Sequence, residues 1–418
     1  MEPFTRRGAE LFCEEIPLER IAAEVATPCY VYSRSAIEQR WRAFDGAFGK
    51  YPHLICYSVK ANSNLAILNL LARLGSGFDI VSGGELERVM RAGGDPDKTV
   101  FSGVGKTRPE IRQALEAGVR CIDVESLEEL QRVNQVAGEL GHQAQVSIRV
   151  NPDIDANTHP FIATGLNDAK FGMDTQTALT AYQTGAQMDN VLVTGIATHI
   201  GSQIVDNVPF VEALGRLLRL VEDLEEQHIT IEHVDIGGGL GIRYRDETPP
   251  DIASYVQALI DTMRGRGFEL PIIVEPGRAI IGGAGVLLTR VEYLKRTPTK
   301  HFAIVDAGMN DFLRPALYNA WQDIVTVTER SDRPMIEVDV VGPVCENTDV
   351  LGEDRRLAIA EGDLLAIRDA GAYGSVMSSN YNARPRPAEV MVDGEEYYLI
   401  RHRETIDELC SAESVLPG

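Results

Sequence analysis

The sequence repeats one pattern eight times between about residues 50 and 280. In each repeat, a short apolar run rich in strand-forming residues is followed by a few small or polar residues and then by a stretch with helical periodicity. Eight such units predict a closed (β/α)8 barrel of the TIM type, and an open doubly wound sheet is the competing architecture. The expected barrel strands are Leu54–Val59, Gly77–Ile80, Thr99–Phe101, Cys121–Val124, Gln145–Val150, Leu192–His199, His233–Ile236 and Pro271–Val274.

The pattern changes after about residue 281, where strand-like runs replace the alternation of strands and helices. Asp393-Gly394 in this region is typical of a hairpin turn. The sequence therefore predicts an α/β barrel domain over residues 35–281 and a second, mainly β domain, a β-barrel or sandwich, over residues 282–418. Residues 1–34 precede the barrel and are expected to pack with the C-terminal β domain.

Charge and cysteine spacing limit the partners of the chain. The 62 acidic and 40 basic residues give a formal charge of −22, which repels nucleic acid and anionic bilayers, so neither is expected as a partner. The six cysteines are irregularly spaced without a C-x-x-C pair, which favours reduced thiols. Because the first 20 residues hold no apolar run of the signal-peptide kind, a cytoplasmic location is expected.

Polar residues stand where the expected barrel strands end. In TIM-barrel enzymes the active site lies at the carboxyl ends of the strands, so residues there are functional candidates. Lys60 ends the first strand, Asp79 lies near the end of the second, and His199 ends the sixth. Glycines follow the seventh strand, and Glu275-Pro276-Gly277-Arg278 follows the eighth. All of them are expected at one mouth of the barrel.

Lys60 follows an apolar strand in the segment Tyr57-Ser58-Val59-Lys60-Ala61-Asn62. At a partly desolvated rim, a lysine amine can lose its proton and attack a carbonyl carbon to form an imine. A lysine at a strand end can also simply extend its charge into solvent, and this is the commoner case for an isolated one. The residues at the other strand ends favour the imine.

Gly237-Gly238-Gly239-Leu240-Gly241 allows main-chain N–H groups to approach a phosphate closely. The spacing is not that of a dinucleotide-binding loop, because Ile242 stands where the last glycine would be, and this weakens the case for an NAD-dependent enzyme. A glycine run can also be only a turn. The segment is therefore a candidate phosphate site whose support comes from its neighbours.

Glu275 and His199 have more than one possible role. A carboxylate beside a pyridine nitrogen would keep that nitrogen protonated and so make the ring an electron sink, whereas Glu275 with Arg278 could also be a structural ion pair. His199 could be a base, a metal ligand, a flat partner for an aromatic cofactor, or a structural residue. Since no second ligand stands at metal spacing, no metal is expected.

Taken together and in order, these segments resemble those of the alanine-racemase-fold (type III) pyridoxal phosphate decarboxylases, and among them the diaminopimelate decarboxylases of lysine biosynthesis. The resemblance covers nearly the whole chain. Its segments are Tyr57-Ser58-Val59-Lys60-Ala61-Asn62, Phe78-Asp79, Glu85, Lys170-Phe171-Gly172, His199-Ile200-Gly201-Ser202, the glycine run, Glu275-Pro276-Gly277-Arg278, Gly342-Pro343-Val344-Cys345-Glu346 and Asp369-Ala370-Gly371-Ala372-Tyr373-Gly374.

The resemblance implies a set of residues around pyridoxal 5'-phosphate. Lys60 is then the residue that binds the cofactor as an imine, His199 stacks on its ring, and Glu275 contacts the ring nitrogen. Asp79 and Glu85 support the site. The residues that then bind the phosphate are Ser202, Gly239, Gly277, Arg278 and Tyr373.

The resemblance also implies the substrate and the assembly. The family's substrate residues fall on Arg278, Arg314, Tyr318, Glu346 and Tyr373. Two arginines suit a substrate with a second carboxylate, and ornithine decarboxylases of this fold usually have aspartate where Glu346 stands. The implied reaction is decarboxylation of meso-2,6-diaminopimelate at its D-centre to L-lysine and CO₂. Cys345 matches the family's proton donor, which enters from the neighbouring subunit of a homodimer.

Three other functions remain open from the sequence. The same fold can decarboxylate ornithine, arginine or another diamino acid, and it can racemise amino acids. The chain could also bind pyridoxal phosphate without catalysing a reaction, although Lys60, Cys345 and Glu346 are all present. A panel of substrates separates these alternatives.

Overall fold

The computed structural model describes residues 2–155 and 170–418. Its chain divides into two compact units. The barrel unit comprises Arg40–Arg243 and Glu247–Ala279, and the β unit comprises Met1–Gln39, Tyr244–Asp246 and Ile280–Gly418. A short excursion of the barrel chain, Tyr244–Asp246, therefore belongs to the β unit.

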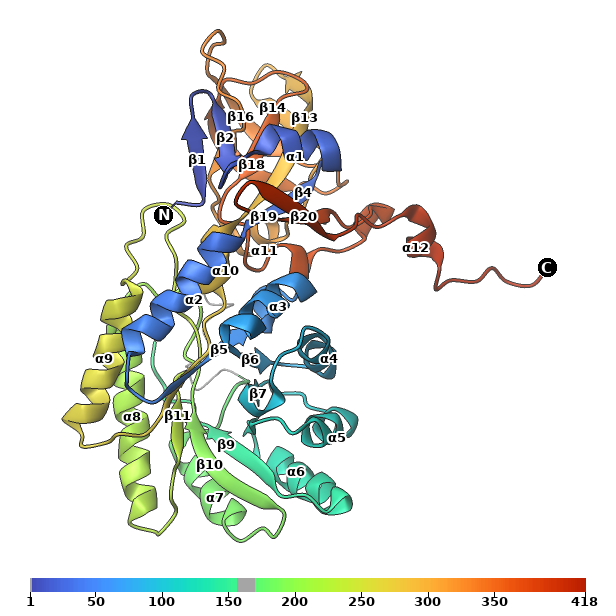
Figure 1. Cartoon of the computed structure of the whole chain (residues 1–418). Coiled ribbons are helices and arrows are strands. Elements are labelled where there is room, and N and C mark those ends of the chain that lie inside the picture. Colours follow the sequence, from blue (N-terminus) through green and yellow to red (C-terminus); the bar gives the residue numbers. More distant parts are fainter. Residues whose placement is uncertain (1, 156–169) are drawn as a thin grey trace. The chain divides into compact units, whose positions relative to one another are not determined.

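Eight parallel strands close into a barrel, so the predicted TIM-type architecture is confirmed (Figure 1). The strands follow one another around the barrel in chain order, and the last pairs with the first. Because both faces of such strands are covered, they appear in the sequence as short apolar runs, which is why their positions were predictable. The strands are β5 (His53–Ser58), β6 (Gly77–Ile80), β7 (Thr99–Phe101), β8 (Cys121–Val124), β9 (Ala144–Arg149), β10 (Val191–Ala197), β11 (His233–Asp235) and β12 (Ile272–Val274).

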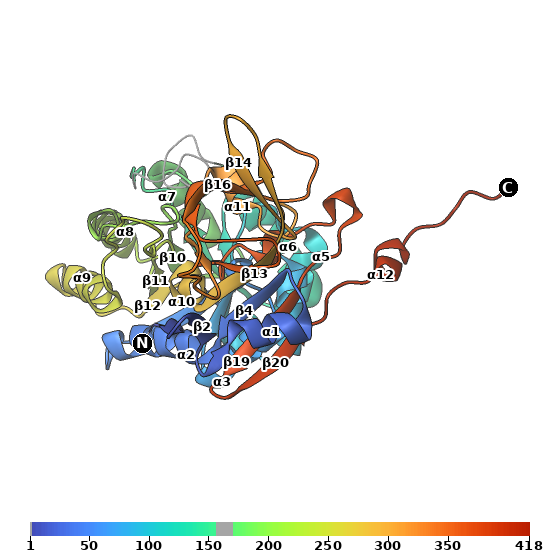
Figure 2. The same ribbon diagram turned by 90° about the horizontal axis from the view of Figure 1, so that it is seen from above.

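Helices cover the outside of this barrel (Figures 1 and 2). Their ends follow local signals: Thr107 and Glu110 form a capping box at the start of α5, and Gly118 adopts the left-handed conformation just past its end. The helices are α2 (Arg34–Phe48), α3 (Leu65–Leu74), α4 (Gly83–Arg91), α5 (Arg108–Ala117), α6 (Leu127–Leu140), α7 (Thr175–Gly185), α8 (Val208–Glu225) and α9 (Ile252–Gly265). The short helix α10 (Arg278–Ile281) follows the last barrel strand.

The β unit is built on a nine-stranded sheet in the order β17-β16-β14-β13-β4-β19-β20, with β15 and β18 off this path. Strand β17 was not predicted, because Gly352 and a run of charged residues interrupt its apolar pattern. The strands are β4 (Cys29–Ser33), β13 (Gly285–Arg296), β14 (His301–Val305), β15 (Ile324–Thr326), β16 (Ile336–Val341), β17 (Val350–Leu357), β18 (Leu364–Ile367), β19 (Ala388–Asp393) and β20 (Glu396–Arg401).

The N-terminal segment belongs to this unit. Its strand β4 pairs antiparallel with β13 and parallel with β19. Side chains from the two ends of the chain share one apolar core, in which Leu11 and Val31 pack with Val286 and Val390. The remaining elements of the unit are β1 (Phe4–Arg7), β2 (Glu10–Cys13), β3 (Ile16–Pro17), α1 (Leu18–Val25), α11 (Arg314–Tyr318) and α12 (Ile406–Cys410).

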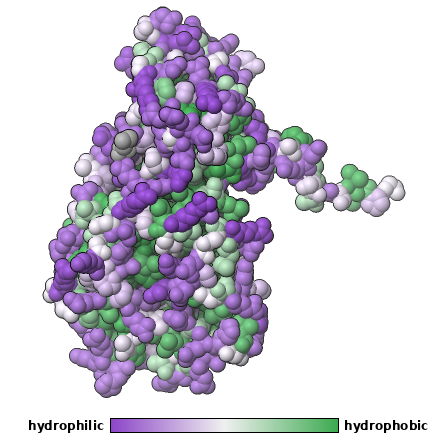
Figure 3. Space-filling model, viewed as in Figure 1, coloured by the Kyte–Doolittle hydropathy of each residue, from purple (hydrophilic) through white to green (hydrophobic). Residues whose placement is uncertain are grey.

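The surface drawn in Figure 3 is mostly hydrophilic, in keeping with the high charge of the chain. Among the described residues, no helix is both long and apolar enough to cross a bilayer.

Candidate active site

The carboxyl ends of the barrel strands surround a pocket of about 420 Å³. Three predicted residues, Lys60, His199 and Glu275, are brought together there from β5, β10 and β12. Lys60 lies in a short 3-10 turn (Val59–Ala61) after β5, and His199 lies two residues beyond the end of β10. The lining residues are Lys60, Val81, Ser102, Gly103, Val104, Gly105, Asp123, Arg149, Phe171, Ala197, Thr198, His199 and Glu275.

The Lys60 amine forms an ion pair with the buried carboxylate of Asp79. Ser58 Oγ also donates to Asp79, at 2.8 Å. Burial alone would raise the pKa of Asp79, but the charge and hydrogen bond of Lys60 outweigh it and hold this pKa below its usual value. Asp79 thus orients the Lys60 amine. The Lys60 side chain is still 32% exposed, so the amine is accessible from the pocket.

Three further carboxyl groups meet beneath the pocket. Oxygens of Asp123, Asp235 and Glu275 lie within 4.8 Å of one another, and all three residues are buried. Ser102 Oγ contacts both Asp123 Oδ2 (3.1 Å) and Glu275 Oε1 (3.3 Å). One hydroxyl has one proton, so it can serve only one of these acceptors at a time. The cluster therefore needs protons or a cation.

The pKa values of the three groups shift in the direction that this crowding requires. Burial raises the pKa of Asp123 to about 7. Burial, together with the neighbouring carboxyl groups, holds the pKa values of Asp235 and Glu275 well above the usual range. A positively charged group placed at Glu275 would favour the ionised form of the cluster.

His199 is a neutral imidazole. Burial first, then the charges of Arg149 and Lys60, lower its pKa to about 3. The backbone N–H of Gly238 donates to its Nδ1 at 3.1 Å, so the ring proton is on Nε2. A neutral ring held by its edge suits a flat packing partner better than a base.

The loops after β10, β11 and β12 converge beside His199. Gly237 and Gly239 have left-handed φ values of 70° and 108°, and a Cβ at Gly239 would lie 2.4 Å from the carbonyl oxygen of Gly201. These loops are bound together, since Ile204 N–H donates to Gly239 O at 2.9 Å. Arg278 Nη2 donates to Ser202 Oγ at 3.0 Å.

The supporting role expected for Glu85 has a local basis. Glu85 lies in the first turn of α4 and accepts a hydrogen bond from Val81 N–H at 2.7 Å. Burial raises its pKa to about 7, although that hydrogen bond and Lys60 oppose the rise. The side chain thus holds the loop between β6 and α4, which carries Val81 into the pocket wall.

Gly277 lies in the barrel unit, directly before α10, and the remaining predicted residues lie in the β unit. Arg314, which is buried, begins α11, and the Tyr318 ring lies 6.0 Å from its guanidinium carbon. Cys345 and Glu346 are exposed; Cys345 Sγ donates to Asn382 Oδ1 at 3.3 Å, and Tyr381 donates to Glu346. Tyr373 has a left-handed φ of 55° in the loop after β18.

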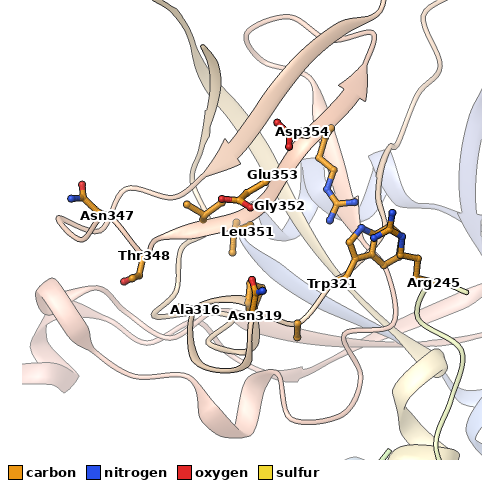
Figure 4. A pocket seen from close by; sticks show the side chains of 14 residues that line it. Arg245, Ala316, Asn319, Trp321, Asn347, Thr348, Leu351, Gly352, Glu353 and Asp354 are labelled. Atoms are coloured by element: carbon orange, nitrogen blue, oxygen red, sulfur yellow. The ribbon is translucent and has the colours of Figure 1, made fainter. Parts of the chain in front are cut away.

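A pocket of about 710 Å³ borders α11 within the β unit. Figure 4 shows Asn319 at one side of it and Trp321 beside Arg245 at another. Arg355 also lines this pocket, with its guanidinium carbon 4.6 Å from the Trp321 ring. The pocket is therefore bounded by α11, β17 and the excursion from the barrel unit.

Comparison with known proteins identifies the family. A family model described as "Pyridoxal-dependent decarboxylase, pyridoxal binding domain" matches residues 34–282. The chain is 58% identical to the diaminopimelate decarboxylase of Pseudomonas aeruginosa, with both chains covered completely. The chain belongs to the diaminopimelate decarboxylases. The diaminopimelate decarboxylase of Vibrio cholerae is 57% identical over 99% of this chain and 98% of its own.

A solved structure of a diaminopimelate decarboxylase has the same fold. The Helicobacter pylori enzyme, complexed with L-lysine, matches with a TM-score of 0.91 and 42% identity. The match covers 94% of this chain and 98% of that one. The family resemblance predicted from the sequence is thus confirmed along the chain.

Sequence reasoning missed four polar residues of the mouth: Ser102, Asp123, Arg149 and Asp235. Arg149 forms a buried ion pair with Glu125 at 2.7 Å and lies in the pocket wall. The strand-end rule could have found them, because each lies at or just after the carboxyl end of an expected strand. They were passed over because no motif marked them.

Replacing Asp123 with asparagine should change how stability depends on pH. In the cofactor-free protein, a folded-state pKa of about 7 lies above the usual 3.8, so the folded state holds this proton more tightly than the unfolded state. As the pH rises from 4 to 7, the free energy of unfolding of the wild type should therefore fall relative to that of Asp123→Asn. The expected decrease is up to about 1.4 kcal/mol per pH unit. Urea unfolding at several pH values measures this difference.

The matched control is Asp261→Asn, an exposed residue on α9. The unfolding free energies of Asp261→Asn and wild type should follow parallel curves across the same pH range. Parallel curves for Asp123→Asn as well would show that folding does not raise the pKa of Asp123, and would contradict the prediction.

Proposed function

We propose that the chain decarboxylates meso-2,6-diaminopimelate at its D-centre to give L-lysine and CO₂, the last step of lysine biosynthesis. The observation that carries this proposal is the 58% identity to a diaminopimelate decarboxylase over the full length of both chains. The chain also places Lys60, His199 and Glu275 at one barrel mouth. The relative solved with L-lysine supports the product.

The residues of the mouth fit pyridoxal 5'-phosphate. The accessible amine of Lys60 matches the aldehyde of this group. The buried acidic cluster matches its basic nitrogen, and the neutral ring of His199 matches its aromatic face. Lys60 would hold it through the amine, Glu275 at the ring nitrogen, and His199 against the ring. Its phosphate would be held by Ser202, Gly239, Gly277, Arg278 and Tyr373. When bound, pyridoxal phosphate supplies an electron sink for the electrons that departing CO₂ leaves behind.

Glu275 would favour a proton on the ring nitrogen of the bound cofactor. Its carboxyl group shares a buried site with Asp123 and Asp235, where an added negative charge is unfavourable unless a positive charge balances it. The cluster would therefore favour a positively charged, protonated nitrogen at this position. Ser102 orients the Glu275 carboxyl through its contact with Oε1.

The β unit recognises the retained end of the substrate. Arg314 binds the carboxylate that stays, because a guanidinium offers a planar fork of N–H donors to two carboxylate oxygens. Glu346 pairs with the ammonium group of the same end, and Tyr318 and Tyr373 complete the site. Anchoring this end sets the angle of the bond to the departing carboxylate, which must stand perpendicular to the π system to break.

Cys345 returns a proton to the carbon from which CO₂ leaves. The overall reaction consumes one proton, and a thiol can donate one to carbon. We propose that Cys345 and Glu346 act in the site of a neighbouring copy, which makes a homodimer the active form. Their exposure in a single chain supports this assignment.

Lys60→Ala should abolish the release of L-lysine and CO₂ from meso-diaminopimelate, because no other residue is proposed to hold the cofactor covalently. Activity should fall by at least about three orders of magnitude. The matched control is Lys98→Ala, whose amine contacts only the backbone at Gly75 O on the barrel exterior. Borohydride treatment followed by peptide mass spectrometry should find cofactor on the Lys60 peptide of wild type. Full activity of Lys60→Ala would refute the proposal.

Mixing two inactive variants tests the shared site. If Cys345 serves the neighbouring copy, a heterodimer of Lys60→Ala and Cys345→Ala has one site with both residues intact. Random exchange of equal amounts makes half of the dimers mixed, so activity should return to about a quarter of wild type. If both residues act within one chain, the mixture stays as inactive as its components, and the shared site is wrong.

A further inference from the structure

The excursion of the barrel chain into the β unit begins next to Arg314. Tyr244 lies three residues after Gly241, the end of the glycine run, and belongs to the β unit. Its ring centre lies 5.3 Å from the guanidinium carbon of Arg314, closer than that of Tyr318 at 6.0 Å. Two aromatic rings thus contact one buried guanidinium.

A second contact of the same kind fixes the excursion. Arg245 extends over the ring of Trp321, with its guanidinium carbon 5.6 Å from the ring centre (Figure 4). Arg355 lies 4.6 Å from the same ring. Trp321 follows α11 by three residues, so the excursion is attached close to both ends of the short helix that carries Arg314. The position of Tyr244 is therefore set by its neighbour as well as by its own contact.

Aromatic contact leaves the binding edge of a guanidinium available. A ring attracts the cation through the face of its π system, whereas the N–H donors that bind a carboxylate lie in the guanidinium plane. A ring can thus fix the orientation of that plane without using those donors. A leucine or methionine at the same position would fill space but would not attract the charge.

We propose that Tyr244 is a positioning residue that orients the Arg314 guanidinium toward the retained carboxylate of the substrate. This inference rests on the role proposed above for Arg314. It assigns a part in substrate recognition to a residue on the segment that follows the glycine run. Loss of the ring weakens binding of ligands with this carboxylate and spares ligands that lack it.

The test compares two ligands on holoenzyme. L-lysine keeps the carboxylate, whereas cadaverine is the same diamine without it, and each is measured as an inhibitor of diaminopimelate turnover. In Tyr244→Leu, the inhibition constant of L-lysine should rise about tenfold and that of cadaverine should stay within about twofold, as loss of a desolvated cation–π contact predicts. The KM for diaminopimelate should rise more than kcat falls, and cofactor content should not change.

Three further variants complete the design. Tyr244→Phe keeps the ring and should restore L-lysine inhibition to near the wild-type value. Tyr244→Met replaces Tyr244→Leu if the leucine variant lowers the unfolding temperature. Tyr397→Leu is the matched control, since Tyr397 contacts the Arg20 guanidinium at 5.6 Å in the same unit, and it should leave both inhibition constants unchanged.

Arg314→Ala separates the two proposals. If Arg314→Ala selectively weakens inhibition by L-lysine and Tyr244→Leu does not, the inference about Tyr244 is wrong and the role of Arg314 stands. If Arg314→Ala affects both ligands equally, the role of Arg314 itself is wrong. If inhibition by L-lysine and by cadaverine weakens equally in Tyr244→Leu, the inference is also overturned, because this result would indicate a general disturbance of the unit.

Discussion

Four carboxyl groups are buried at the mouth of the barrel, and the Lys60 amine forms its ion pair with Asp79 among them. The chemistry of the site depends on this imbalance. The Lys60 amine is committed to Asp79, so Asp123, Asp235 and Glu275 must be neutralised in another way. Burial and mutual repulsion raise their pKa values, so protonation of the cluster is favoured in the cofactor-free protein. Under the proposed function, a positive charge beside Glu275 would meet part of the same requirement. The cluster would then favour a protonated nitrogen at this position.

Much of this fold could be predicted because its signals are local. Buried parallel strands are apolar runs, and a closed barrel brings their carboxyl ends to one rim, so the placement of Lys60, His199 and Glu275 followed from strand order alone. The pairing of β4 with β13 and β19 joins segments more than 250 residues apart, and no local pattern encodes it. The same holds for Tyr244, whose contact with Arg314 depends on a non-local excursion.

The candidate site was predicted unevenly for a similar reason. Residues inside recognisable motifs were found, whereas Asp123 and Asp235 are single acids within apolar strands and look like ordinary strand ends. Their effect arises only when barrel closure brings them within reach of Glu275. Arg314, Glu346 and Cys345 came from the family resemblance alone, because nothing in strand order relates the β unit to the barrel mouth.

The acidic cluster also bears on the place of the proton donor proposed above. Burial and the neighbouring carboxyl groups raise the pKa values of Asp235 and Glu275, because an added negative charge in this buried cluster is unfavourable. A proton taken from the cluster would therefore leave an uncompensated charge among buried carboxyl groups. Cys345 lies outside that cluster, which is consistent with the proposal that it supplies the proton that decarboxylation consumes.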